Sequence, residues 1–148
     1  MTKIDDSRPF IPVGIAVLTV SDTRSLAEDK SGQTLADRIA EAGHRLIDRA
    51  IVTDDAALIR EKVLGWSRDE RIDVVITTGG TGFTGRDVTP EALEPLFEKR
   101  MEGFATLFLM VSHAKIGTSA IQTRATAGVA GATYIFCLPG SPGACRDA

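Results

Sequence analysis

A glycine-rich loop and two aspartates are the residues of this sequence whose types and spacing could do chemistry. The loop lies in the segment TTGGTGFTGRDVTPEAL at residues 77–93, directly after the apolar run IDVVI. Glycine allows a backbone to turn sharply and to bring its N–H groups close to an anion. The loop glycines that could do so are Gly79, Gly80 and Gly82. Because Thr81 and Ser141 can donate further hydrogen bonds, the pattern predicts phosphate binding.

The two aspartates could supply metal ligands beside this loop. A carboxylate next to a phosphate cradle is costly unless a divalent cation lies between them, which makes Asp87 a candidate ligand of such a cation. Asp54 follows the second strand pattern and could bind metal or water jointly with Asp87. The alternative for Asp87 is an ion pair with Arg86 or a helix cap, and for Asp54 and Asp55 it is helix N-capping.

Two familiar phosphate motifs do not explain the loop. A Walker A loop needs a lysine after its last glycine, and this loop has none. Gly80, Gly82 and Gly85 match G-x-G-x-x-G literally, but the helix start at Pro90 comes several residues too late. The pattern also follows the third strand rather than the first, so a dinucleotide dehydrogenase is disfavoured.

The elements that must position these residues alternate between strands and helices. The strand patterns cover residues 13–20, 44–52 and 72–78, and the helical patterns cover residues 33–42 and 53–70. In the second helix, Ile59, Val63 and Trp66 share one face. This order predicts a three-layer α/β/α fold with a mostly parallel central sheet.

The second half of the chain is expected to extend the sheet with a small antiparallel hairpin. A helix should begin at Pro90 with Thr89 as its cap. Another should span residues 101–115 with four large apolar side chains on one face, which are Phe104, Leu107, Phe108 and Val111. From Ala125, two short strands joined at residues 131–132 predict the hairpin. The last stretch, GACRDA, is expected to be too short to pack, which suggests a further C-terminal segment in the natural protein.

The loops that leave the strands should meet in one place. We expect residues 1–12 to form a flexible arm and residues 13–148 to form one domain. In a parallel sheet, ligands collect outside the carboxyl ends of the strands. Three loops leave such ends, and they are SDTRSLAEDKSG, TGGTGFTGRD and PGSPG. They should converge on one cleft, into which Asp54 would also point.

Composition limits the classes of partner. The chain has 148 residues and a net charge of −3 with both signs spread along it, so it lacks the basic footprint of nucleic-acid binding. Cys137 and Cys145 have no histidine or third cysteine near them, which argues against a zinc site and a disulfide framework. No uninterrupted apolar run approaches the ~20 residues of a membrane span. We expect a cytoplasmic protein without nucleic-acid or membrane partners.

Taken together, the motifs resemble those of one family. LTVSDTRS, GGTG, RDVTPEA and LPGSPGA occur in that order, and the sequence is identified as a member of the MoaB/MogA family of molybdenum cofactor biosynthesis proteins. DKSGQTLADRIAEAGH, EGFATLF and IGTSAIQTRATAGVAG favour the MoaB branch. The resemblance implies a molybdopterin-binding α/β/α domain with ATP and molybdopterin as substrates and Mg²⁺ as cofactor. Active members transfer AMP from ATP to the terminal phosphate of molybdopterin.

The resemblance also implies roles for particular residues. Asp54 and Asp87 match the family's acidic catalytic positions, and we expect Asp87 to hold Mg²⁺. The residues that would line the nucleotide and the pterin are Ser21, Ser31, Gly79, Gly80, Thr81, Gly82, Thr123, Arg124, Pro139, Gly140 and Ser141. The alternative function is a non-catalytic molybdopterin-binding carrier on the same fold. The resemblance further implies a homotrimer or homohexamer that acts with other molybdenum cofactor biosynthesis proteins.

Overall fold

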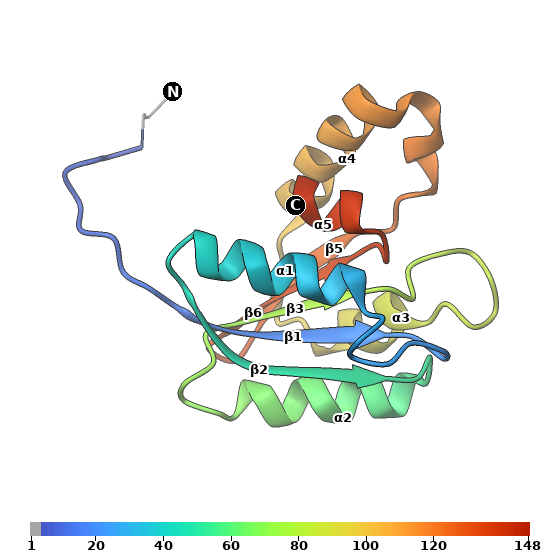
Figure 1. Cartoon of the computed structure of the whole chain (residues 1–148), viewed down its shortest axis with the longest axis horizontal. Coiled ribbons are helices and arrows are strands. Elements are labelled where there is room, and N and C mark those ends of the chain that lie inside the picture. The colour runs from blue at the N-terminus through green and yellow to red at the C-terminus, as the bar shows by residue number, and fades with distance from the viewer. Residues whose placement is uncertain (1–3) are drawn as a thin grey trace.

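A six-stranded sheet forms the middle layer of the protein, as Figure 1 shows in a computed structural model that describes residues 4–148. The strands are β1 (Gly14–Val20), β2 (Arg45–Val52), β3 (Val74–Thr78), β4 (Lys99–Arg100), β5 (Thr126–Ala130) and β6 (Thr133–Leu138). Their order across the sheet is β2-β1-β3-β6-β5-β4. The first four in this order are parallel, and β5 pairs antiparallel with both β6 and β4.

Helices cover both faces of the sheet. They are α1 (Lys30–Glu41), α2 (Ala56–Ser67), α3 (Thr89–Leu93), α4 (Glu102–Ile116) and α5 (Pro142–Asp147), with short 3₁₀ segments η1 (Glu94–Leu96) and η2 (Gly117–Gln122). Side chains of α2 and α3 join the core on one face, and side chains of α1, α4 and α5 join the core on the other. The predicted three-layer α/β/α fold with a mostly parallel sheet and a small antiparallel hairpin is therefore confirmed.

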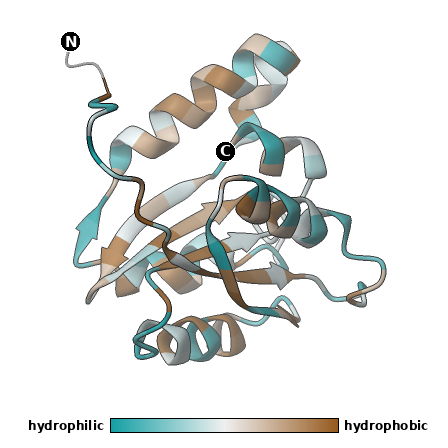
Figure 2. Ribbon diagram, turned by 60° about the vertical axis from the view of Figure 1, so that its left-hand side comes forward, coloured by the Kyte–Doolittle hydropathy of each residue, from teal (hydrophilic) through white to brown (hydrophobic). Residues whose placement is uncertain are grey.

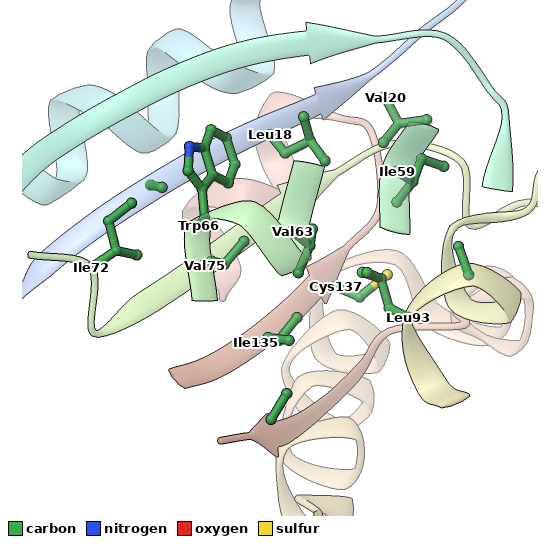
Figure 3. Close-up of a cluster of buried hydrophobic side chains, with 13 residues drawn as sticks. Leu18, Val20, Ile59, Val63, Trp66, Ile72, Val75, Leu93, Ile135 and Cys137 are labelled. Atoms are coloured by element: carbon green, nitrogen blue, oxygen red, sulfur yellow. The ribbon is translucent and has the colours of Figure 1, made fainter. Parts of the chain in front are cut away.

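Strand β1 explains why the core has two halves. All seven of its residues are buried, and successive side chains of a strand point to opposite faces. Leu18 and Val20 therefore pack under α2 with Ile59, Val63 and Trp66, as Figure 3 shows. On the other face, neighbouring β1 side chains contact the α1 core instead. The apolar face predicted for α2 is thereby confirmed.

Helix α1 begins three residues before the predicted helix. Asp29 caps it, because its Oδ1 accepts the backbone N–H of Gly32 at 2.9 Å. The expectation that the helix starts at residue 33 was wrong, since the apolar periodicity that located it begins only at Leu35. This earlier start places Ser31 inside the helix, where it is buried.

Helix α3 corrects a second expectation. Thr89 does not cap it but is its first residue, and Val88 holds the cap position without a side-chain hydrogen bond. The Thr89 hydroxyl donates instead to the carbonyl of Gly79 at 2.9 Å. Thr89 therefore ties the start of the helix to the glycine loop. Only five residues are helical before the chain continues in a 3₁₀ segment.

The C-terminal helix packs, contrary to the expectation that it is too short to do so. Helix α5 contacts α1 and α4, and its Cys145 is buried in the same core as Leu35 and Ile39 of α1. Lys115 of α4 also forms an ion pair with Asp147. One buried side chain and contacts to two helices thus hold a helix of six residues in place.

Helix α4 exposes most of its apolar side chains. Phe108 is buried and Phe104 packs on Phe136, but Leu107 is 65% exposed and Val111 is 40% exposed, so the expected common face of four residues is only half covered. Figure 2 shows these hydrophobic segments on the helix that stands off the sheet. Together with η2, the helix is long and apolar enough to cross a membrane by those two criteria alone, which is weak evidence for a span.

The hairpin and the chain start complete the description. Strands β5 and β6 form the predicted hairpin, with its turn at Gly131, where φ is 61°. The two-residue strand β4 was not predicted, because so short a segment carries no alternation pattern. Of the predicted arm at residues 1–12, residues 1–3 lie outside the described residues, and residues 4–12 form neither helix nor strand. Phe10 of this segment contacts the ring of His44, with ring centroids 5.1 Å apart.

Candidate active site at the carboxyl ends of the strands

The loops after β1, β3 and β6 meet at one edge of the sheet. Figure 1 shows the strands β1 and β2 ending at this edge, beside the loop that follows β3. Ser31 Oγ donates to the carbonyl of Gly140 at 2.8 Å across 109 residues of sequence. The N–H of Gly79 donates to the carbonyl of Leu138 at 3.0 Å. The expected convergence of the three loops is therefore present.

Two positions of the loop after β3 require glycine. Gly79 and Gly80 have φ of 98° and 71°, in the left-handed region that favours glycine. A Cβ on Gly79 would lie 2.4 Å from the carbonyl oxygen of Val20, and one on Gly80 would lie 2.1 Å from Thr89 Oγ1. The tight turn predicted from these glycines is thus imposed by both conformation and close packing.

Asp87 lies against the glycine loop and is held by Thr84. The backbone N–H and the hydroxyl of Thr84 donate to Asp87 Oδ2 at 3.0 Å and 2.7 Å. These hydrogen bonds from Thr84 stabilise the charged carboxylate and lower the pKa of Asp87. Arg86 does not pair with Asp87, so the alternative role of an ion pair between them is wrong. A carboxylate with a lowered pKa stays ionised and suits cation binding.

Asp54 has the opposite electrostatic environment. Burial raises the pKa of Asp54, and the negative charges of Asp22 and Asp87 raise it further. Its neighbour Asp55 caps α2, accepting the N–H groups of Ala57 and Leu58. Asp54 therefore does not cap the helix, and the capping alternative holds only for Asp55. A carboxylate whose ionised form is disfavoured by two other carboxylates is one that a cation would stabilise.

Both carboxylates face the same short stretch of backbone. A Cβ built on Gly80 would lie 3.3 Å from Asp54 Oδ1, and one built on Gly82 would lie 2.7 Å from Asp87 Oδ2. The chain thus brings residues from the loops after β2 and β3 to two sides of one glycine segment. Their pKa values are shifted in opposite directions there. Such divided environments are typical of functional sites.

Arg124 holds the glycine loop through hydrogen bonds to its backbone. Its guanidinium donates to the carbonyls of Thr81 at 2.9 Å, Gly82 at 2.7 Å and Asp87 at 3.3 Å. It also pairs with Glu91. Since most of its donors are used in this way, Arg124 acts in this structure as a brace for the loop.

The other predicted lining residues differ in accessibility. Ser31 is fully buried and joins α1 to the last loop, whereas Ser21 is half-buried and accepts the N–H groups of Thr23 and Arg24. Thr81 is also buried. Ser141 is exposed and caps α5. Their roles as substrate contacts stay predictions, and of this group Ser21 and Ser141 are the more accessible.

A cavity of about 350 Å³ lies beside the last loop. Thr123, Pro139 and Ser141 line it, together with side chains of α4 and α5 such as Phe108. This cavity joins three of the predicted lining residues. Larger apolar hollows lie elsewhere, one of about 550 Å³ over α1 and α5 and one along α4. The cluster around Asp54 and Asp87 is a loop surface and not one of these hollows.

Sequence reasoning missed Asp22 and Arg86, which meet at this edge. Arg86 donates to both carboxylate oxygens of Asp22, at 3.0 Å and 2.9 Å. Asp22 also accepts the backbone N–H of Asp54 at 2.9 Å. The signal was present, because both residues stand in the loops already expected to converge. The pairing itself could not be read from residues 64 positions apart.

Magnesium fits this arrangement in a limited way. Within residues 4–148 no group of three or more histidine, cysteine or acidic side chains is placed to hold a metal alone. Mg²⁺ is usually bound by one or two carboxylates plus substrate phosphates and water. Asp87, whose Oδ1 is not used by Thr84, and the cation-favouring Asp54 suit that mode. The cysteines do not offer an alternative nucleophile, because burial raises the pKa of Cys137 to about 12 and also raises the pKa of Cys145.

Comparisons with known proteins agree with this geometry. A family model described as "Probable molybdopterin binding domain" matches residues 16–148. Molybdenum cofactor biosynthesis protein B of Escherichia coli K12 is 50% identical over 142 residues, which are 96% of this chain and 84% of that protein.

Two solved structures extend the similarity to three dimensions. A crystal structure of molybdenum cofactor biosynthesis protein B superposes with a TM-score of 0.91 at 44% identity, covering 95% of this chain and 88% of the other. The tungsten cofactor synthesizing protein MoaB from Pyrococcus furiosus superposes with a TM-score of 0.83 at 34% identity, covering 92% and 87%.

Proposed function

The chain belongs to the MoaB/MogA family of molybdenum cofactor biosynthesis proteins, and from this premise we propose that it adenylylates molybdopterin. A role in molybdenum cofactor biosynthesis and the molybdopterin-binding domain follow from the family. The step itself is our proposal, with ATP and molybdopterin as its substrates. It would occur in the cytoplasm, together with other proteins of the same pathway.

The proposed reaction exchanges one phosphoanhydride bond for another. A terminal phosphate oxygen of molybdopterin attacks the α-phosphorus of ATP, and the bond from that phosphorus to the bridging oxygen of the β-phosphate breaks. Pyrophosphate leaves with the electron pair of that bond, and AMP becomes joined to the pterin phosphate. Such a transfer needs alignment and charge neutralisation rather than a covalent enzyme intermediate.

The residues of the strand-end cluster could meet these needs. Gly79, Gly80 and Gly82 would offer backbone N–H groups to the phosphates, and Arg124 would hold the loop in shape. Asp87 would hold Mg²⁺, and Asp54 would help to place the metal or the attacking phosphate. When bound, Mg²⁺ would supply positive charge against the phosphates.

One observation carries the proposal. Asp54 and Asp87 border the same glycine segment at the carboxyl ends of parallel strands, where such sheets bind ligands. Two carboxylates beside a phosphate loop would repel a polyanionic substrate unless a cation lies between them. A protein that only carried the pterin would have no evident use for this pair.

The test is an assay of the purified protein with molybdopterin, ATP and Mg²⁺, scored for adenylylated pterin and pyrophosphate. Asp87→Asn should lower turnover at least about 100-fold, since it removes the charge that holds the metal, while pterin binding stays largely intact. Asp69→Asn is the matched control, because Asp69 lies before β3 at the opposite end of the strands. It should leave turnover unchanged.

Two results would contradict the proposal. Unchanged turnover in Asp87→Asn would show that Asp87 does not hold a metal needed for the reaction. Tight pterin binding by the wild-type protein without any product would mean that it is a non-catalytic carrier.

The exposed side of α4 supports a proposal about assembly. Leu107 and Met110 are 65% and 63% exposed, and further apolar side chains lie beside them. We propose that this surface packs against other copies in a homotrimer or a homohexamer of two trimers. Light scattering that shows only monomers would refute this.

A further inference from the structure

Arg86 is the cation that spans the loops around the proposed site. It follows the glycine segment, precedes Asp87 and reaches across to Asp22 in the loop after β1. Both of its bonds to Asp22 use the planar fork of the guanidinium, at 3.0 Å from Nε and 2.9 Å from the terminal nitrogen. Because Asp22 also accepts the N–H of Asp54, the guanidinium is held close to the carboxylate of Asp54.

Arg124 and Arg49 are committed to structural roles. Arg124 donates to three loop carbonyls and pairs with Glu91, so it cannot leave without releasing the loop. Arg49 pairs with the buried carboxylate of Asp29, and its own side chain is only 16% exposed. Neither guanidinium is available to an incoming phosphate.

The Asp22–Arg86 pair is different because Arg86 can exchange Asp22 for another anion. The side chain of Arg86 is 67% exposed and that of Asp22 is 35% exposed, and exposed ion pairs are weak because water and salt screen them. A carboxylate presents two oxygens to the guanidinium fork in the way that a phosphate does. Asp22 therefore occupies, around Arg86, the position that a phosphate group would take.

The charge of the site favours such a contact. Asp22, Asp54 and Asp87 gather at this edge, and each adds to the repulsion that a polyphosphate would meet. A single divalent cation does not offset three carboxylates and a nucleotide together. An exposed guanidinium beside them supplies positive charge where the phosphates would lie.

We propose that Arg86 binds the phosphates of the nucleotide, and that Asp22 is the positioning residue that holds its guanidinium before the nucleotide arrives. This inference rests on the proposed adenylyl transfer and gives a role to Arg86, the first residue of the RDVTPEA motif, to which the resemblance assigned none. On binding, Arg86 exchanges the carboxylate of Asp22 for phosphate oxygens. Asp22 keeps its hydrogen bond to the Asp54 backbone.

The experiment is calorimetric titration of the purified protein with ATP and Mg²⁺, without molybdopterin. Arg86→Gln should weaken nucleotide binding at least about tenfold, since it removes charge-assisted hydrogen bonds to phosphate. The matched control is Arg71→Gln, because Arg71 is 71% exposed and forms a similar pair with Asp69 at the opposite end of the strands. Its nucleotide affinity should stay within twofold of wild type.

Swapping the two residues of the pair distinguishes a phosphate-binding role of Arg86 from a purely structural role, in which the ion pair only links the two loops. The double variant Asp22→Arg with Arg86→Asp restores an ion pair but moves the cation to the other loop. If Arg86 binds phosphate, nucleotide affinity stays as low as in Arg86→Gln. Recovery to within twofold of wild type would overturn the proposal, because the pair would then act only as a tie.

The same titrations distinguish this inference from the proposed function. If the wild-type protein binds the nucleotide and Arg86→Gln binds it equally well, the Arg86 assignment fails alone. If the wild-type protein binds no nucleotide, both the adenylyl transfer and the Arg86 assignment fail. Unfolding curves of each variant confirm that affinities are compared between folded proteins.

Discussion

Two ion pairs anchor the two ends of the loop between β1 and α1, and they differ in almost every respect. At its end, Asp29 pairs with Arg49, and the side chains are 0% and 16% exposed. At its start, Asp22 pairs with Arg86, and the side chains are 35% and 67% exposed. One pair lies inside the protein, and the other lies in contact with water.

The surroundings of the two carboxylates explain the difference. Asp29 accepts the hydroxyl of Thr19 at 2.6 Å, the N–H of Gly32 at 2.9 Å and the guanidinium of Arg49 at 3.2 Å. A buried charge persists only when it is paired and hydrogen-bonded in this way. Asp22 has two partner residues, Arg86 and Asp54, and its side chain stays partly in contact with water. The buried pair therefore belongs to the scaffold, and the exposed pair is free to change partners.

The strongest test of this contrast is Asp29→Ala. Removing one member of a buried pair leaves the other charge uncompensated, so we expect a loss of about 3–5 kcal/mol in the free energy of unfolding. Urea unfolding measures it. Asp22→Ala is the control and should cost much less stability, since exposed pairs are screened by water and salt. Similar losses in the two variants would show that the pairs do not differ in the way their burial indicates.

A second test concerns the loop that carries Arg86. Gly80→Ala forces a side chain into a left-handed conformation and against Thr89 Oγ1, so we expect it to cost about 2–3 kcal/mol of stability. Gly85 is the matched position, because a Cβ there meets nothing within 4 Å. Gly85→Ala should change the unfolding free energy by less than about 0.5 kcal/mol. Equal effects would mean that the loop adapts freely at both positions.

The smallest expected effect comes from Asp54, through pH. Its pKa is raised in the folded protein, so the folded state binds more protons than the unfolded state near that pKa, and stability is lost as the pH rises through it. In metal-free buffer, Asp54→Asn should therefore be more stable than wild type at pH 7. The gain should shrink as the pH falls towards the ordinary aspartate pKa of about 3.9.

Unfolding at pH 7 and at pH 4.5 measures this difference. The neighbouring cap provides the comparison, since Asp55→Ala should lose about 1 kcal/mol at pH 7 by removing hydrogen bonds to the start of α2. A loss of stability in Asp54→Asn at pH 7 would contradict the raised pKa of Asp54 and its assigned causes, which are burial and repulsion by Asp22 and Asp87.

Much of the fold could be predicted from local pattern, and the errors have identifiable causes. The apolar run of β1 and the spacing of Ile59, Val63 and Trp66 in α2 predicted elements that the structure contains. The predicted start of helix α1 was too late because the first turn of the helix is polar. The capping residue is a carboxylate whose other partners are distant in sequence. Helix α5 was misjudged because its packing depends on one buried side chain, Cys145.

The residues of the candidate site could be predicted from the sequence, but their hydrogen-bond partners could not. Asp54, Asp87 and the loop glycines were identified from their types and their place after strands, and the structure brings them together. Arg124 was expected to contact substrate, yet its hydrogen bonds hold the loop. Residue type predicts what a side chain can bond, but its actual partner depends on which chain segments lie within about 3 Å.

The sequence by itself determined the alternation of strands and helices and the glycine segment after β3. It also determined the acidic residues at strand ends, since these depend on local preferences and on periodicity. Only the tertiary structure decided that Asp29 is buried with Arg49, that Asp22 faces Arg86, and that the pKa values of the two proposed catalytic carboxylates shift in opposite directions. Burial and electrostatic interaction depend on distances between residues far apart in the chain, and folding alone sets those distances.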